Sequence, residues 1–231
     1  MLLVLPYNSK HLPLYKHIFE LKGAAMHDVL LTGPNSQVYE MEQALNVLKG
    51  AFNHADIFTG DHEYKSKNRL FSHTVRWLDS VGNEEPFYWF ADSVPVKSSW
   101  LADLTAEYFS KQMPYLGATE NAPGWNPGTR KWEEEPPRLI GASIYPPDLW
   151  HRSILIRQLS YGEKEEPWHS LMRFEMRPDA TQSEIIQNGG SVSPKAGVLA
   201  NVDVLAVVAE MRKEQVEPAK PSEKVAQKKE K

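Results

Sequence analysis

Asp92 is the residue whose setting most clearly suggests chemistry in this 231-residue chain. It follows the apolar run Phe87-Tyr88-Trp89-Phe90, a pattern typical of a buried strand, so its carboxylate is expected at the strand end, facing a cleft. A carboxylate there could ligate Mg²⁺ or Mn²⁺, and the cation could neutralise a diphosphate leaving group. The alternative is a turn or helix cap, which is a common role of aspartate after a strand.

Three basic residues, Lys65, Lys67 and Arg69, cluster where the sequence predicts the start of a helix. A helix start with cations nearby attracts a diphosphate. The alternative is a solvated helix face, the usual setting of such residues.

Trp125, Trp132 and Trp168 lie in polar segments outside the predicted core. Aromatic rings in such segments can form platforms for sugars or unstacked bases. The alternative is that each ring only fixes its loop. The sequence contains no P-loop, Gly-x-Ser-x-Gly, zinc-ligand or Gly-x-Gly-x-x-Gly pattern, which leaves nucleoside triphosphatase, esterase and dehydrogenase functions without support.

The elements that must position Asp92 alternate in type along the first half of the chain. Short apolar runs predict strands, and segments with apolar residues at helical spacing predict helices, one of them capped by Ser36. The predicted strands are 2–5, 28–32, 55–59 and 87–91, and the predicted helices are 12–22, 36–48 and 65–80. This order implies βαβ crossovers and a mainly parallel sheet with helices on both faces. Ligands bind beyond the carboxyl ends of such strands, which places Tyr7, Asn8, residues 33–35, Asp92 and Ser93 on one rim.

The second half has a less regular pattern. It predicts a helix from Ser98 or Ser99 to Lys111, strands at 115–118 and 138–145, a long polar loop at 120–137, helices at 148–159 and 168–176, and a short strand or turn at 184–187. From Glu214 the composition is too polar to bury, so a single domain over 1–213 and a disordered charged tail over 214–231 are expected.

The amino-acid composition restricts the binding partners and the cellular location expected for the protein. The formal net charge of −4 gives no general footprint for nucleic acid, and the lack of cysteine excludes disulfides and thiolate metal sites. The first apolar run is too short for a signal sequence or a membrane span. A cytoplasmic protein that does not enter a membrane is therefore expected, and the sequence predicts no particular oligomeric state.

Several motifs share their order and spacing with a known family. They are Asn68-Arg69-Leu70-Phe71, Tyr88 to Pro95, Trp100-Leu101 with Glu107-Tyr108, Tyr115-Leu116-Gly117, Gly141 to Pro146, Trp168 to Glu175, and Ile185-Ile186-Gln187. Together they resemble a family of small GT-A glycosyltransferases found largely in bacteriophage genomes. The resemblance covers residues 2–190. It implies an α/β, GT-A-like single domain that uses a nucleoside-diphosphate sugar as donor and Mn²⁺ or Mg²⁺ as cofactor.

The resemblance also implies roles for individual residues. Asp92 and Glu175 would be catalytic, with Glu175 as the general base for an acceptor hydroxyl, and Asp92 and His169 would hold the metal. A salt bridge to Arg173 or Arg177 is the alternative role of Glu175. The implied donor-binding residues are Pro6, Tyr7, Asn8, Asn68 and Ser93, and the implied acceptor-binding residues are Gly141, Ser143 and Trp168. The Tyr7 ring could stack on the base and the Asn8 amide could read its edge, although an ordinary turn predicts the same two residues.

Three positions depart from the family pattern. Phe90 stands where an acidic residue is expected, His169 replaces an aspartate, and Asn188 replaces a histidine. A metal could still be held by Asp92, His169 and diphosphate oxygens, because imidazole suits Mn²⁺. The alternative is a weakened or metal-independent site.

The implied reaction is transfer of a hexosyl or pentosyl group to a hydroxyl. Because the related sequences lie in phage genomes, the expected acceptor is modified DNA, such as a hydroxymethylated pyrimidine flipped out of the duplex. The alternatives are a non-catalytic module that binds nucleotide sugars or glycans, and a glycosyltransferase that acts on a protein or a small molecule.

Overall fold

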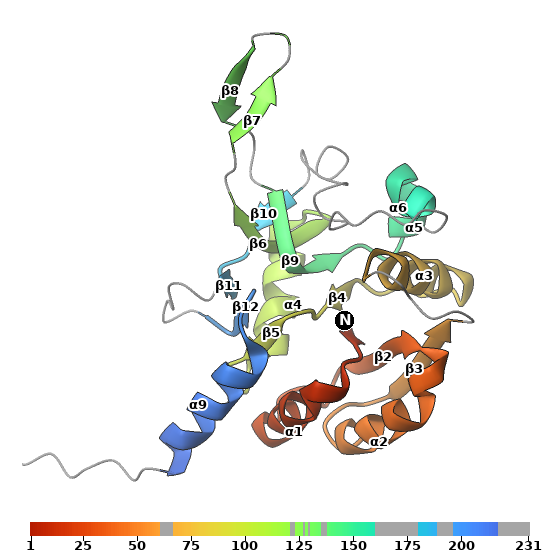
Figure 1. The fold of residues 1–231 in the computed structure, drawn as a ribbon, viewed down its shortest axis with the longest axis vertical. Coiled ribbons are helices and arrows are strands. Elements are labelled where there is room, and N and C mark those ends of the chain that lie inside the picture. Colours follow the sequence, from red (N-terminus) through yellow and green to blue (C-terminus); the bar gives the residue numbers. More distant parts are fainter. Residues whose placement is uncertain are drawn as a thin grey trace, which may run out of the picture.

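The structure is a computed structural model that describes residues 1–60, 67–120, 123–126, 128, 130–134, 138–159, 180–188 and 196–216. These ranges form a seven-stranded central sheet with helices on both faces, a three-stranded second sheet and a two-stranded hairpin (Figure 1). Within the described residues, no helix has the length and apolar character needed to cross a membrane.

The first half alternates parallel strands with helices, as the hydrophobic periodicity predicts. Its elements are β1 (Leu2–Pro6), α1 (Leu12–Leu21), β2 (Asp28–Pro34), α2 (Val38–Leu48), β3 (Ala55–Gly60), α3 (Lys67–Ser80) and β4 (Phe87–Trp89). Short 3₁₀ turns, η1 (Ser9–His11) and η2 (Asn35–Gln37), precede α1 and α2. The predicted cap at Ser36 is wrong, because Ser36 lies inside η2 and no side chain caps α2.

The second half contains shorter elements. They are β5 (Ser93–Pro95), α4 (Trp100–Lys111), β6 (Tyr115–Glu120), β7 (Pro123–Asn126), β8 (Lys131–Glu134), β9 (Arg138–Tyr145), α5 (Leu149–Arg152), α6 (Ile154–Leu159), β10 (Ala180–Gln182), β11 (Ile186–Asn188), β12 (Val198–Ala200) and α9 (Val204–Val216). The predicted helix over 168–176 lies outside the described residues.

Two predictions for the second half need correction. The expected loop over 120–137 contains the antiparallel hairpin β7–β8, with Trp125 opposite Trp132 in the backbone register. The expected helix over 148–159 is divided at Ser153, whose extended backbone ends α5 and whose hydroxyl accepts a hydrogen bond from the Ile156 N–H. The predicted division into a domain over 1–213 and a tail over 214–231 stays a prediction, because α9 continues to Val216 and residues 217–231 lie outside the described residues.

The central sheet has the order β10-β6-β9-β4-β1-β2-β3. Its neighbouring strands are parallel, except that β9 runs antiparallel to both β4 and β6. The prediction of an α/β fold with a mainly parallel sheet is therefore confirmed. From β1 the chain builds outward through β2 and β3, and it then returns to place β4 on the other side of β1. The carboxyl ends of β1 and β4 thus form a topological switch point, where open α/β sheets bind ligands.

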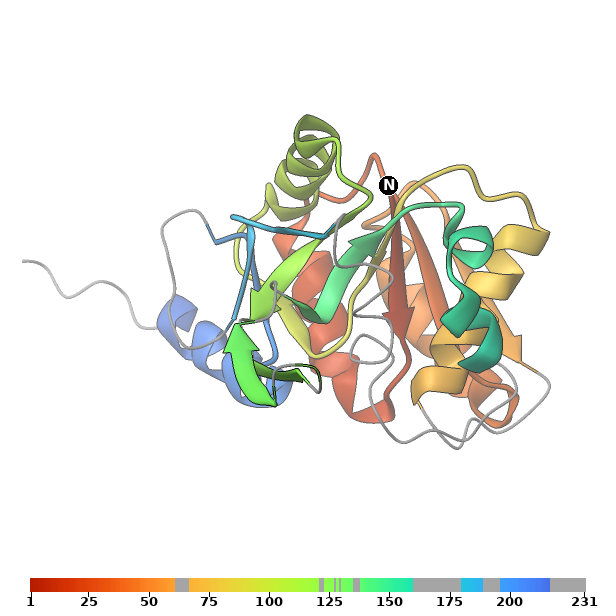
Figure 2. The ribbon, with the colours of Figure 1, turned by 90° about the horizontal axis from the view of Figure 1, so that it is seen from above.

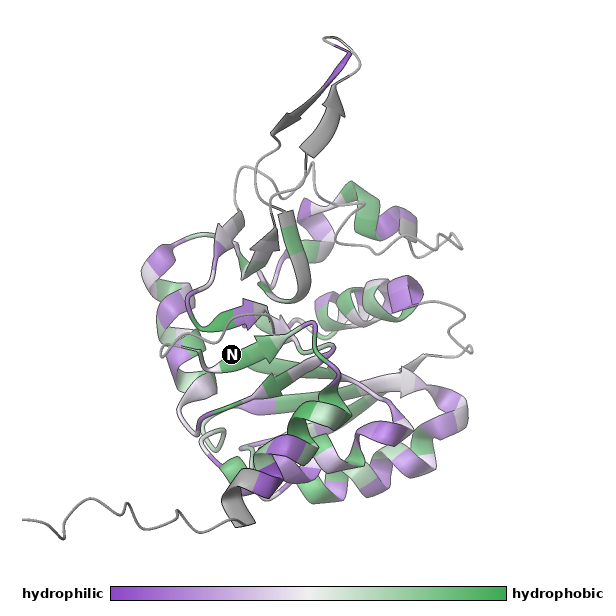
Figure 3. Cartoon of the chain, turned by 60° about the vertical axis from the view of Figure 1, so that its left-hand side comes forward, coloured by the Kyte–Doolittle hydropathy of each residue, from purple (hydrophilic) through white to green (hydrophobic). Residues whose placement is uncertain are grey.

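Side chains of successive strand residues enter separate cores on the two faces of the sheet. Leu3 and Leu5 pack in the core beneath α1, α2, α4 and α9, whereas Val4 packs in the core beneath α3, α5 and α6. Figures 1 and 2 show this three-layer arrangement, and Figure 3 shows that the strands beside the amino terminus are mostly apolar. Burial on both faces explains the unbroken apolar runs in the sequence of these strands.

Gly23 follows α1 in a backbone conformation that suits glycine, with a φ of +82°. A Cβ atom there would lie 1.6 Å from the Ser98 carbonyl oxygen. We expect Gly23→Ala to lower the free energy of unfolding by about 3 kcal/mol, measured by urea denaturation. Gly82→Ala is a matched control, because Gly82 has a φ of +70° but open space around its Cβ position. It should cost about 1 kcal/mol, and equal losses for the two variants would contradict a steric role of Gly23.

Candidate functional site

The candidate site lies at the switch point, where β1 and β4 end beside each other. Tyr7 and Asn8 follow β1, and Asp92 lies between β4 and β5. Because β1 and β4 are parallel neighbours, with Val4 opposite Trp89, the segments after them emerge at the same rim. The structure therefore brings the rim residues predicted after these two strands to one place.

Asp92 occupies the point where the chain leaves the central sheet and enters the second sheet. Its φ of +47° lies in the left-handed region, which aspartate tolerates better than most residues with a side chain. Its backbone carbonyl accepts a hydrogen bond from the Val202 N–H at 3.2 Å, and the next residue, Ser93, pairs with Ala200 of β12. The carboxylate therefore projects from a backbone that is fixed on both sides.

The carboxylate of Asp92 is paired with Lys67, the first residue of α3. The distance from Lys67 Nζ to Asp92 Oδ2 is 3.2 Å, and the side chains are 83% and 51% exposed respectively. An ion pair this exposed contributes only about 0.5 kcal/mol to stability. The pair therefore places a cation and an anion at the rim and adds little to the stability of the fold.

His11, in η1, is a third titratable group at this rim. Burial lowers the pKa of His11, with a smaller raising effect from Asp92 and a smaller lowering effect from Lys67. Asn8 Nδ2 lies 3.4 Å from His11 Nε2, so the amide and the imidazole ring are neighbours at this rim. His11 is not among the predicted site residues, although its place just after the first strand, at a helix start, could have indicated it.

The segment after β1 is held by local contacts. The Tyr7 ring stacks on Tyr15 with centroids 6.4 Å apart, and the Asn8 N–H donates to the Tyr15 hydroxyl at 3.3 Å. Asn8 Oδ1 accepts from the Lys10 N–H at 3.0 Å and so caps η1, as the turn alternative predicts. Pro6, the last residue of β1, is half-buried. These contacts restrict the conformations of the segment, which reduces the entropic cost of binding a ligand there.

The other predicted donor-binding residues lie in the interior. Asn68 in α3 is 3% exposed, and Ser93 is fully buried. The Ser93 hydroxyl donates to the Ala91 carbonyl at 2.8 Å and so stabilises the turn around Asp92. Both residues lie next in sequence to a member of the Lys67–Asp92 pair, and the Ser93 contact fixes the backbone that carries Asp92.

Phe90, at the position where the family resemblance expects an acid, is a core residue. It is 3% exposed, and its ring packs against Tyr88 and Trp100 at centroid distances of 5.5 and 5.4 Å. In the part of the chain that the structure describes, no group of three or more His, Cys, Asp or Glu side chains could hold a metal ion. Mg²⁺ and Mn²⁺ prefer several oxygen ligands, so the described residues do not fit a divalent-metal site.

Of the three predicted acceptor-binding residues, Gly141 and Ser143 lie in β9 and Trp168 lies outside the described residues. Ser143 lies in β9 opposite Trp89, the last residue of β4, and is fully buried. Gly141, two residues earlier on this antiparallel strand, lies nearer the rim. Trp168, His169 and Glu175 lie outside the described residues, so their predicted roles stay predictions.

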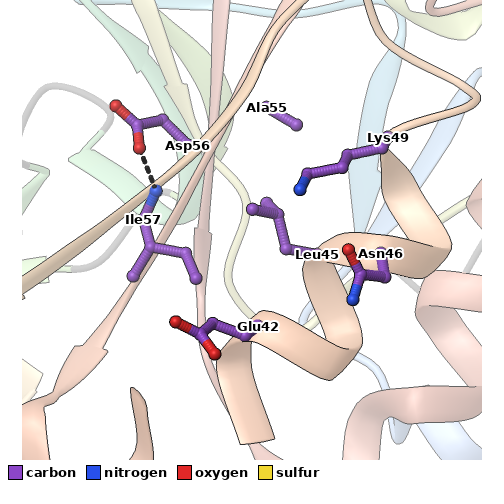
Figure 4. Close-up of a pocket in the computed structure, with 7 residues that line it drawn as sticks. All are labelled: Glu42, Leu45, Asn46, Lys49, Ala55, Asp56 and Ile57. Carbon is purple, nitrogen blue, oxygen red and sulfur yellow. Dashed lines mark hydrogen bonds between the residues drawn. The ribbon is translucent and has the colours of Figure 1, made fainter. Parts of the chain in front are cut away.

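A surface pocket of about 450 Å³ lies elsewhere, between α2 and the edge strand β3 (Figure 4). Its lining residues are Glu42, Leu45, Asn46, Lys49, Ala55, Asp56 and Ile57. The Asp56 carboxylate accepts a hydrogen bond from the Ile57 N–H at 2.8 Å. Because β3 begins at Ala55, the pocket lies near the amino ends of the strands, opposite to the carboxyl ends where the candidate site lies.

Comparison with known proteins gives structural matches but no sequence match. No protein-family model matches the chain, and neither does any curated protein. A solved structure of WbbM, a bifunctional glycosyltransferase, aligns with a TM-score of 0.54 and 7% sequence identity over 86% of this chain. The aligned part is 45% of the WbbM chain.

Two other solved structures align less closely. The 4-diphosphocytidyl-2C-methyl-D-erythritol synthase of Anaerococcus prevotii DSM 20548 has a TM-score of 0.47 and 8% identity over 91% of this chain and 95% of that one. The glycosyltransferase GlyE of Streptococcus pneumoniae TIGR4 has a TM-score of 0.48 and 10% identity over 95% of this chain and 66% of that one.

These observations define the fold of the protein. The mixed sheet, the helices on both faces and the likeness to WbbM show an α/β, GT-A-like fold. The predicted fold class is therefore confirmed.

Proposed function

We propose that this protein is a glycosyltransferase that takes its sugar from a nucleoside-diphosphate donor. The observation that carries the proposal is the polar cluster of Asn8, His11, Lys67 and Asp92 at the switch point of a GT-A-like sheet. Groups that can donate or accept hydrogen bonds gather there, at the end of two buried strands. This is where ligands bind in sheets of this kind.

The proposed donor lies across the ends of β1 and β4. The Tyr7 ring and the Asn8 segment would contact the nucleoside, since a half-exposed aromatic ring offers a stacking surface for a base. The diphosphate would lie toward the Lys67–Asp92 pair, where a cation is in place. Asn68 and Ser93 would act by holding the backbone of this pair, because their own side chains are buried.

The proposed transfer forms a bond between an acceptor oxygen and the anomeric carbon of the sugar. The bond from that carbon to the diphosphate breaks, and a base removes the acceptor proton. We propose Glu175 as this base, because the sequence resemblance assigns it that role. When bound by Asp92 and His169, Mn²⁺ or Mg²⁺ would stabilise the departing diphosphate; the support for this pair of ligands is again the resemblance.

The acceptor we propose is a hydroxymethylated pyrimidine in DNA, positioned near Gly141, Ser143 and Trp168. This assignment rests on the resemblance to phage sequences. The net charge of −4 does not favour it, although Lys and Arg residues near the rim could supply local attraction.

Mass spectrometry of nucleosides from hydroxymethylated DNA tests the proposal. The protein is incubated with this DNA and mixed nucleotide sugars, and DNA with unmodified pyrimidines serves as the matched control. We expect a hexosyl or pentosyl mass increase on the modified base and release of a nucleoside diphosphate.

The remaining outcomes separate the parts of the proposal. Release of nucleoside diphosphate that does not depend on modified DNA would remove the acceptor and keep the transferase. No release from any donor, with Asp92→Ala binding sugar nucleotides as the wild type does, would leave a non-catalytic binding module instead.

A further inference from the structure

We infer that Lys67 is the resident cation of the donor site and binds the diphosphate of the donor without a divalent metal. The inference rests on the proposed function, because it assigns the counter-ion of the same diphosphate. It replaces one part of that function, the metal held by Asp92 and His169, because it makes donor binding independent of Mn²⁺ and Mg²⁺.

The Lys67 amine lies where a metal ion would be expected. It lies 3.2 Å from Asp92 Oδ2, on the carboxylate that the resemblance assigns to the metal. A metal ion on that oxygen would have to displace the amine or share the carboxylate with it. Lys67 thus already supplies positive charge at the position where the metal is expected.

The position at which the family resemblance expects a second carboxylate is apolar in this chain. Two residues before Asp92, the chain places Phe90 in the core against Tyr88 and Trp100. Asp92 alone would bind a hard divalent ion weakly, because such ions take several oxygen ligands. A lysine amine has no such coordination requirement, and its three N–H groups can donate to phosphate oxygens as a point charge.

The Lys67 side chain is free to move at the surface. It is 83% exposed, so few packing contacts restrain it, and the paired carboxylate is itself 51% exposed. Asp92, by contrast, is anchored by its left-handed backbone and by the hydrogen bond from Val202. The anchored Asp92 carboxylate therefore holds the flexible Lys67 amine at the rim. From there the amine can reorient to donate to a diphosphate oxygen.

The position of the pair also matches the position of a diphosphate. The Tyr7–Asn8 segment, proposed for the nucleoside, follows β1, and the pair lies at the end of the neighbouring strand β4. His11 interacts electrostatically with both Asp92 and Lys67, which places it in the same cluster. A nucleotide bound along this rim would present its diphosphate to Lys67.

Isothermal titration with inorganic pyrophosphate tests the inference, in excess EDTA and again with added Mn²⁺. We expect the wild-type protein to bind pyrophosphate in EDTA, and Lys67→Ala to bind about tenfold more weakly, the loss typical of a charge-assisted hydrogen bond. Lys67→Arg should retain most of the affinity because it keeps the charge. Lys49→Ala is the matched control, since Lys49 is exposed in the pocket near the amino ends of the strands.

Three results would overturn the inference: binding only when Mn²⁺ is present, equal affinity of Lys67→Ala and wild type, or no binding under either condition. The proposed function is judged separately by transfer from nucleotide sugars. Transfer that requires Mn²⁺ would remove the role of Lys67 and keep the glycosyltransferase. Pyrophosphate binding that depends on Lys67, without transfer from any donor, would keep the anion site and remove the glycosyltransferase.

Discussion

Asp92→Asn should lower the turnover of the cognate nucleotide sugar by about 100-fold, because it removes the charge that holds a cation against the leaving diphosphate. Asparagine has nearly the same shape and also tolerates the left-handed backbone at this position. The exposed ion pair with Lys67 contributes little to stability, so the melting temperature should change by about 2 °C or less. Steady-state kinetics and thermal unfolding of the same preparation provide the two measurements.

Two control variants identify the cause of the loss. Asp92→Gly also removes the carboxylate but relaxes the backbone, and it should lose as much activity as Asp92→Asn with equal or greater stability. Asp56→Asn removes an exposed carboxylate from the pocket near the amino ends of the strands and should keep wild-type turnover. Wild-type turnover of Asp92→Asn would show that the carboxylate has no part in the reaction.

Phe90→Asp should unfold the protein or cost more than about 4 kcal/mol of unfolding free energy, since it combines a cavity with a buried carboxylate. The substitution introduces the acid that the family resemblance expects. The Phe90 ring, however, lies among Tyr88, Trp100 and the rest of the core beneath α1 and α4. Circular dichroism during urea denaturation measures the loss.

Phe90→Leu is the matched control for this substitution. It keeps the site apolar with a modest loss of volume, and it should cost about 1.5 kcal/mol and unfold cooperatively. A stable Phe90→Asp protein that binds Mn²⁺ would show instead that this side chain faces the cleft, and it would restore the two-carboxylate metal site.

The first half of the fold is well predicted from sequence because its signals are local. Strands such as Leu2–Pro6 are buried on both faces, so their apolar runs are unbroken, and α1 ends beside Gly23 as the glycine indicates. The second half depends on tertiary contacts. The β7–β8 hairpin has a polar composition, and over the described side chains of α9, residues 204–213, only Val204 and Val208 are buried, so neither element gives a strong pattern.

The sequence predicts where the site lies better than it predicts which residues form it. Strand ends predict that Tyr7, Asn8 and Asp92 share a rim, since parallel neighbours end at the same edge. The burial of Asn68, Ser93 and Ser143 is not visible in sequence, because small polar residues occur at rims and in interiors alike. The ion pair between Lys67 and Asp92 joins residues from different elements, so only the fold can select Lys67 among the neighbouring cations.

Hydrogen–deuterium exchange in the presence of a panel of nucleoside-diphosphate sugars tests the central claim, that the donor binds where β1 and β4 end. We expect at least one donor to slow exchange in peptides covering 6–11 and 91–93, while peptides covering the pocket at 42–57 exchange as before. Protection confined to 42–57, or no protection by any donor, would contradict it.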